Sequence, residues 1–129
     1  MRVGLAVLCI LGLALPGAVE AAPIFKATLI ASTHTPKVNT NWFYVLSVTD
    51  AKGKLVKASV TAQLVDPFGG VHAVEFGCCK ATLAKHMFTG VFGDYVKFPP
   101  EAQGVKLVFR LTVTALGAKR VLAYRINPR

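Results

Sequence analysis

Two adjacent cysteines, Cys78 and Cys79, are the residues whose type and spacing point most directly to chemistry. Neighbouring Cα atoms lie about 3.8 Å apart across a trans peptide, whereas disulfides usually span about 4.4 to 6.8 Å. A bond between the two sulfurs would therefore be strained and easily reduced. The alternatives are a thiolate pair that binds a soft metal, bonds to another chain, or free thiols. We favour the disulfide, because exposed free thiols do not persist in an oxidising compartment.

A metal site is the second interpretation of this region. His72, His86 and Met87 lie within about eight residues of Cys78 and Cys79, and thiolate, imidazole and thioether ligands together suit Cu(I) or Zn(II). Against it, no Cys-x-x-Cys or His-x-x-x-His spacing occurs. His72 shares a strand parity with hydrophobic neighbours, which predicts a partly buried histidine, and Met87 beside an aromatic residue is typical of core filler. We therefore expect no cofactor, and we keep these five residues as metal-ligand candidates.

The acidic residues give little support to hydrolytic catalysis. Beyond the N-terminal region they stand mostly in turns or at strand edges, and no Gly-x-Ser-x-Gly elbow, histidine-metal motif or glycine-rich phosphate loop accompanies them. These acids are Asp50, Asp66, Glu75, Asp94 and Glu101. The sequence therefore predicts a protein that is not an enzyme.

The N-terminal region has the pattern of a secretory signal peptide. Arg2 is followed by an uncharged apolar run over residues 3–15, a Pro16-Gly17 break and the Val19-x-Ala21 pattern that signal peptidase accepts. The alternative is an uncleaved anchor, although the run is short for a membrane span. A lipoprotein is disfavoured, since Cys9 lies within the apolar run. We expect residues 1–21 to be removed, leaving 22–129 as a secreted or periplasmic cell-envelope domain without a membrane span.

The chain is strongly basic, with 15 Lys and Arg against 6 Asp and Glu and a net charge of +9. Such a charge attracts polyanions. The basic residues are scattered rather than clustered, and export makes DNA or RNA an improbable partner. We expect no nucleic acid, and as partner either an unknown protein or an anionic cell-envelope polymer.

Alternation with a period of two dominates the rest of the chain, which is typical of half-buried antiparallel strands. The clearest runs are 42–49, 55–65 and 105–116, and the connector Asp50 to Gly53 is expected to close a hairpin between the first two. A loop is expected over 77–90, with a helical turn around Thr82 to Lys85. The remaining predicted strands are 24–32, 71–76, 91–98 and 120–126. About seven strands without crossover helices predict an all-β, immunoglobulin-like antiparallel sandwich, preceded by a signal-peptide helix.

Three stretches resemble a known family: His34 to Asn39, Trp42 to Asp50 and Gly53 to Val60. They are similar to exported bacterial immunoglobulin-like domains of the YtkA-like type, in which a P-x-x-G-x-N lead-in precedes an apolar strand and a D-x-x-G-x-P-V hairpin. Asn39 stands near the usual glycine, and Val56-Lys57 replaces the usual Pro-Val. The resemblance implies a secreted or periplasmic sandwich near metal-handling or envelope systems, and it transfers no catalytic residue.

These observations favour a secreted, non-enzymatic binding or structural module. Its contact region is expected in the loop 77–90, because loops on a rigid sandwich usually carry function. The alternative is a periplasmic metal-binding or thiol-redox protein that uses Cys78 and Cys79.

The signal-peptide interpretation predicts that the mature protein begins at Ala22. Intact-mass measurement of the protein recovered from the periplasm or medium checks this. A secreted product that still carries Met1 to Ala21 would show an uncleaved anchor instead.

Overall fold

A computed structural model describes residues 24–79 and 85–129, and these residues form eight strands in two antiparallel sheets. The predicted all-β sandwich is therefore confirmed, whereas the signal-peptide helix expected over residues 1–21 lies outside the described residues. The elements are β1 (Phe25–Ala31), β2 (Asn41–Asp50), β3 (Lys57–Val65), β4 (Val71–Ala73), β5 (His86–Thr89), β6 (Val91–Lys97), the 3-10 helix η3 (Pro100–Ala102), β7 (Leu107–Ala115) and β8 (Ala118–Ile126).

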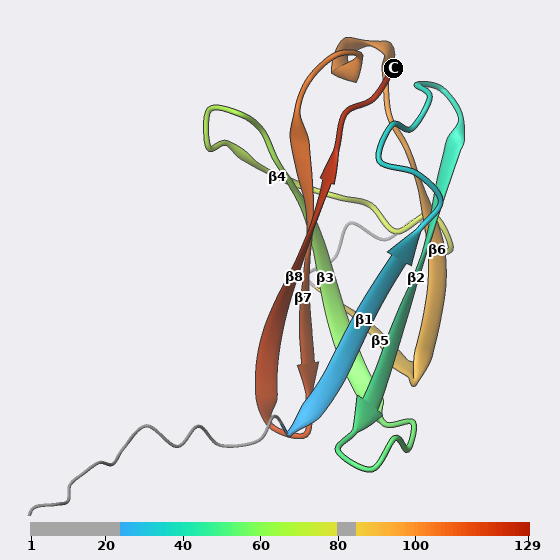
Figure 1. The fold of residues 1–129 in the computed structure, drawn as a ribbon, viewed down its shortest axis with the longest axis vertical. Coiled ribbons are helices and arrows are strands. Elements are labelled where there is room, and N and C mark those ends of the chain that lie inside the picture. The colour runs from blue at the N-terminus through green and yellow to red at the C-terminus, as the bar shows by residue number, and fades with distance from the viewer. Residues whose placement is uncertain (1–23, 80–84) are drawn as a thin grey trace, which may run out of the picture.

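The strand order is that of an immunoglobulin-like sandwich. One sheet has the order β1-β2-β6 and the other β4-β3-β7-β8, with β5 paired to the first residues of β3. These orders correspond to strands A-B-E and C′-C-F-G of immunoglobulin domains. Figure 1 shows β3, β7 and β8 in one layer and β1, β2 and β6 in the other, with the β3–β4 hairpin projecting from the body.

The core forms where the two alternating faces meet. Trp42, Tyr44, Leu46 and Val48 point inward from β2, and every second residue from Leu107 to Ala115 does so from β7. The Trp42 ring packs edge-on against the Phe109 ring, with the ring centroids 5.2 Å apart, and Trp42 Nε1 donates to the Thr33 carbonyl at 2.7 Å. The strand parity predicted for these two segments is confirmed.

The connector from Asp50 to Gly53 forms the expected turn but not the expected hairpin. The Gly53 amide donates to the Asp50 carbonyl at 3.0 Å, and Gly53 adopts φ +87°, which favours glycine. However, β2 and β3 belong to different sheets, and the pairing next to the turn is an isolated bridge between Thr49 of β2 and Leu55, which precedes β3. The turn therefore carries the chain from one sheet to the other, which the local turn signal could not distinguish from a hairpin.

The loop expected over 77–90 is partly wrong, because its last residues form β5. His86 to Thr89 pair with β3, and at Gly90 the chain leaves that sheet and continues as β6 in the other. Gly90 has φ +74°, and a Cβ there would lie 2.7 Å from Leu55 Cβ, so glycine is required at the crossing. The helical turn expected around 82–85 falls largely on residues 82–84, outside the described residues.

Val60 and Leu111 are both 0% exposed, so each should be needed for stability. We expect Val60→Ala to cost about 1 to 3 kcal/mol and Leu111→Ala about 2 to 5 kcal/mol in the free energy of unfolding, from lost burial and the cavity left behind. Urea unfolding measures both. Val121→Ala is the control, because this valine on β8 is mostly exposed and should change little. Equal stability of all four proteins would contradict the described core.

Candidate functional site

A buried carboxylate organises the region around the cysteine pair. Asp94 lies in the middle of β6 and is only 5% exposed. Its Oδ1 accepts from the Cys78 amide at 2.7 Å, and its Oδ2 accepts from the Gly77 amide and the Tyr44 hydroxyl, both at 3.1 Å. Three donors thus offset the cost of burying the carboxylate. The general placement of the acids in turns or at strand edges is wrong for Asp94.

Tyr44 is fixed as a donor in this arrangement. Burial, together with the negative charge of Asp94 and the hydrogen bond to it, raises the pKa of Tyr44 well above its ordinary value. The hydroxyl therefore stays protonated and holds the carboxylate from the core side, while the two amides hold it from the turn.

Gly77 allows the turn to approach β6 closely. A Cβ at this position would lie 2.7 Å from both the Tyr95 ring and the Tyr95 carbonyl oxygen. The next residues turn back on themselves, since the Cys79 amide donates to the Phe76 carbonyl at 3.3 Å. Only a glycine leaves room for the Gly77 and Cys78 amides to reach Asp94.

The turn presents a cluster of two sulfurs and one imidazole. The sulfurs of Cys78 and Cys79 are bonded at 2.12 Å, and both residues are exposed. His86 Nδ1 lies 3.7 Å from Cys79 Sγ, and the three potential ligand atoms all lie within 4.8 Å of one another. The structure thus brings together three of the five predicted metal-ligand candidates.

His86 is held in place by β5 and by aromatic packing. Its Cα pairs with Val60 of β3, and its ring lies 4.5 Å from the Phe92 ring centroid and 5.6 Å from that of Phe76. This half-buried imidazole reaches the cysteines from a different sheet than Asp94, which holds the backbone amides of Gly77 and Cys78.

The other two candidates lie away from the cluster. His72 Nε2 is 2.9 Å from Asp66 Oδ2 in the β3–β4 hairpin, and its side chain is 61% exposed, so the expected partial burial is wrong. The hydrogen bond to His72 and those from Gly70 and Phe68 lower the pKa of Asp66. His72 therefore has a local role in stabilising the hairpin turn.

The expectation that Met87 fills the core is also wrong, because this residue is 56% exposed. Successive side chains of a strand point to opposite faces, so Met87 faces away from the side on which His86 lies. The alternation of side chains along β5 therefore places His86 on the side of the cysteines and Met87 on the opposite side.

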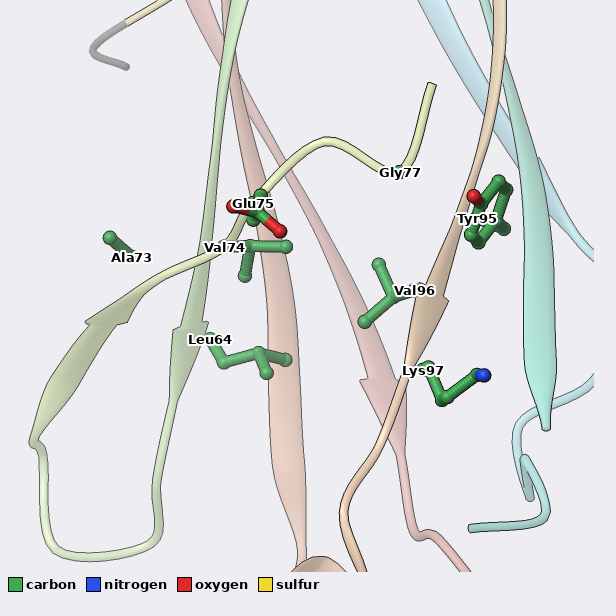
Figure 2. A pocket seen from close by; sticks show the side chains of 8 residues that line it. All are labelled: Leu64, Ala73, Val74, Glu75, Gly77, Tyr95, Val96 and Lys97. Carbon is green, nitrogen blue, oxygen red and sulfur yellow. The ribbon is translucent and has the colours of Figure 1, made fainter. Parts of the chain in front are cut away.

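A cleft of about 320 Å³ lies beside the cysteine turn. Figure 2 shows its two walls, with Leu64, Val74 and Glu75 on one side and Val96 and Lys97 of β6 on the other, and with Gly77 close to Tyr95 at one end. Its interior is lined mainly by aliphatic side chains, and Glu75 and Lys97 are exposed. The cleft was not expected from the sequence, since its walls come from strands of different sheets.

Sequence reasoning missed Asp94, Tyr44 and Gly77 as residues that position the site. One signal was present in β6, where Asp94 occupies the same parity as the buried Phe92 and Val96. An acid at an inward position of a strand indicates a buried carboxylate that needs donors.

The fold and this cluster define a small immunoglobulin-like sandwich with a cysteine pair at the edge of one sheet. Within residues 24–79 and 85–129, no helix has the length and apolar character needed to cross a membrane.

The chain matches no family model and no curated protein. Among the solved structures it is similar to a DUF4466 family protein from Parabacteroides merdae, with 17% identity and a TM-score of 0.47. The match covers 81% of this chain and 44% of that one, so the chain spans less than half of its length.

The role of Asp94 leads to a prediction about Asp94→Asn. The asparagine keeps the size of the side chain but loses the charge, and an NH2 donor replaces one of the two oxygens that accept from Cys78, Gly77 and Tyr44. We expect a loss of about 1 to 3 kcal/mol in the free energy of unfolding and faster hydrogen exchange at the Gly77 and Cys78 amides. Glu101→Gln, at an exposed position, is the control. Unchanged exchange at both amides would show that Asp94 does not hold the turn.

Proposed function

We propose that this chain is an exported, non-enzymatic binding module of the cell envelope, and that the cleft beside the cysteine turn receives an extended segment of a partner protein. The observation that carries the proposal is the position of the cleft between the terminal strands of the two sheets. β4 ends one sheet and β6 ends the other, and the cleft lies between the chain leaving β4 and β6 itself. The cleft adjoins Gly77, the first residue of the expected contact region.

The chemistry of the cleft suits an extended peptide. A strand at the end of a sheet has unpaired backbone groups on its outer edge, and an added peptide strand gains affinity from hydrogen bonds to them. Leu64, Val74 and Val96 supply apolar contact, while Glu75 and Lys97 supply one charge of each sign. A mixed pair of charges favours a peptide over a uniformly anionic polymer, although the net charge of +9 also attracts such polymers.

We further propose a relationship to the YtkA-like domains. It is supported by the immunoglobulin-like strand order and by the turn after Trp42 to Asp50, and it is weakened because that turn joins two sheets rather than two paired strands. Export is proposed on the signal-peptide pattern of residues 1–21.

The cleft proposal predicts a position-dependent effect of charge reversal. Peptides are first selected from a phage-displayed random library on the chain 22–129, and their affinity is then measured by fluorescence anisotropy. We expect Glu75→Lys to weaken binding about tenfold or more, which corresponds to about 1.4 kcal/mol. Glu101→Lys is the matched control, because it makes the same charge change at another exposed glutamate and should leave the affinity within about twofold.

Polyphosphate serves as the anionic-polymer probe in the same assay. If no peptide binds, the cleft proposal is wrong. It is also wrong if polyphosphate binds and both charge reversals strengthen its binding equally, because the binding then follows net charge.

A further inference from the structure

Cys78, Cys79 and His86 form a cluster that peptide binding in the cleft does not use. We infer that, once the bond between Cys78 and Cys79 is reduced, these three residues bind one thiophilic metal ion such as Cu(I) or Zn(II). The cluster is a site with two states, because the sulfurs either bond to each other or bind the metal. This inference does not depend on the cleft proposal.

The spacing between the sulfur and the imidazole fits a shared metal ion. Zn(II) binds thiolate sulfur at about 2.3 Å and histidine nitrogen at about 2.0 to 2.1 Å, so two such ligands at roughly tetrahedral to trigonal angles lie about 3.5 to 3.8 Å apart. Cys79 Sγ and His86 Nδ1 are 3.7 Å apart. Cys78 Sγ completes the group, since all three ligand atoms lie within 4.8 Å of one another.

The ligands are positioned by contacts that do not involve the ligand atoms. Asp94 holds the turn through the Gly77 and Cys78 amides, so the Cys78 and Cys79 side chains take no part in that anchor. His86 is oriented by its pairing with Val60 and by packing on Phe92 and Phe76. A site that is held from outside in this way loses little entropy when the metal binds.

The donor set determines the class of metal. Thiolate sulfur selects Cu(I) and Zn(II) over Mg(II) and Ca(II), and imidazole suits both Cu(I) and Zn(II). Three protein ligands leave a further position for Zn(II), which prefers four, so a water would complete its coordination.

The change of state is a thiol–disulfide exchange followed by metal binding. A dithiol reductant breaks the bond between Cys78 and Cys79 and is itself oxidised to a disulfide, while the two sulfurs each gain a proton. The metal then binds the two thiolates and the neutral imidazole, and the two thiol protons are released to solvent. No metal binds these sulfurs before the reduction, because a disulfide has no thiolate to offer.

The experiment compares oxidised and reduced protein, both as the chain 22–129. Alkylation of unreduced, denatured protein followed by intact-mass analysis first establishes whether the sulfurs are bonded, and no alkyl uptake is expected. The protein is then reduced with dithiothreitol, desalted without oxygen and titrated with Zn(II), with Cu(I) and with Co(II). The absorption from Co(II) bound to thiolates reports sulfur ligation directly.

We expect one metal ion per chain in the reduced protein and none in the oxidised protein. The double variant Cys78→Ser with Cys79→Ser should abolish uptake. His86→Gln should weaken affinity at least about tenfold while keeping the thiolate absorption, whereas His72→Gln and Met87→Leu should match the unmodified protein. Urea unfolding of each variant confirms that it is folded.

Three results would overturn the inference. These are metal uptake by the oxidised protein, an unchanged affinity in His86→Gln, and a stoichiometry of one metal per two chains, which would show a site bridging two molecules. The relative affinities for Cu(I) and Zn(II) then identify the metal within the class.

Discussion

The crossing of the chain between the two sheets at Gly90 is the constraint on which the rest of the architecture depends. Gly90 donates to the Val56 carbonyl at 2.9 Å and accepts from the Val48 amide at 2.7 Å, so it contacts both the residue that precedes β3 and the last part of β2. Four residues before it stands His86 and four residues after it stands Asp94. The imidazole and the carboxylate that define the site therefore come from one continuous stretch of chain, yet they lie in different sheets.

The buried carboxylate of Asp94 ties this crossing to the cysteine turn. Within the described residues the one ion pair is that between His72 and Asp66, so Asp94 is satisfied by hydrogen bonds and not by a cation. Such a carboxylate constrains geometry strongly, because each donor must stay within hydrogen-bonding distance to offset the desolvation of the charge. The turn, the core tyrosine and β6 consequently hold one another in register.

Much of the fold could be predicted from the sequence because two long strands alternate without interruption. Trp42 to Val48 and Leu107 to Ala115 bury every second residue, and this period is a local property of the chain. The short strand β5 could not be predicted in the same way, since four residues are too few to show a period and its partners in β3 lie 26 to 32 residues earlier. The prediction of a hairpin at Asp50 was wrong for a related reason, because the same turn residues suit both a hairpin and a crossing between two sheets.

The sequence indicated which residues of the candidate site lie near one another, but not what holds them in place. Adjacent cysteines and a nearby histidine are visible in the sequence, and the structure brings Cys78, Cys79 and His86 together. His72 is excluded by its position in the β3–β4 hairpin, and Met87 by the alternation of side chains along β5. The role of Asp94 depended on Cys78, 16 residues away from it. Long-range hydrogen bonds of this kind have no signature in a single sequence beyond an acid at an inward strand position.

The anchor of the cysteine turn has a consequence for how this scaffold can change. Asp94 contacts main-chain amides at Gly77 and Cys78, and so it exerts no chemical selection on the side chains that the turn displays. What the fold requires is a glycine at 77 and an acceptor at 94, while positions 78 and 79 are left to whatever task the surface performs. Positions 78 and 79 could therefore carry a different pair of side chains at the same place on the surface, and the sandwich beneath the turn would not need to change.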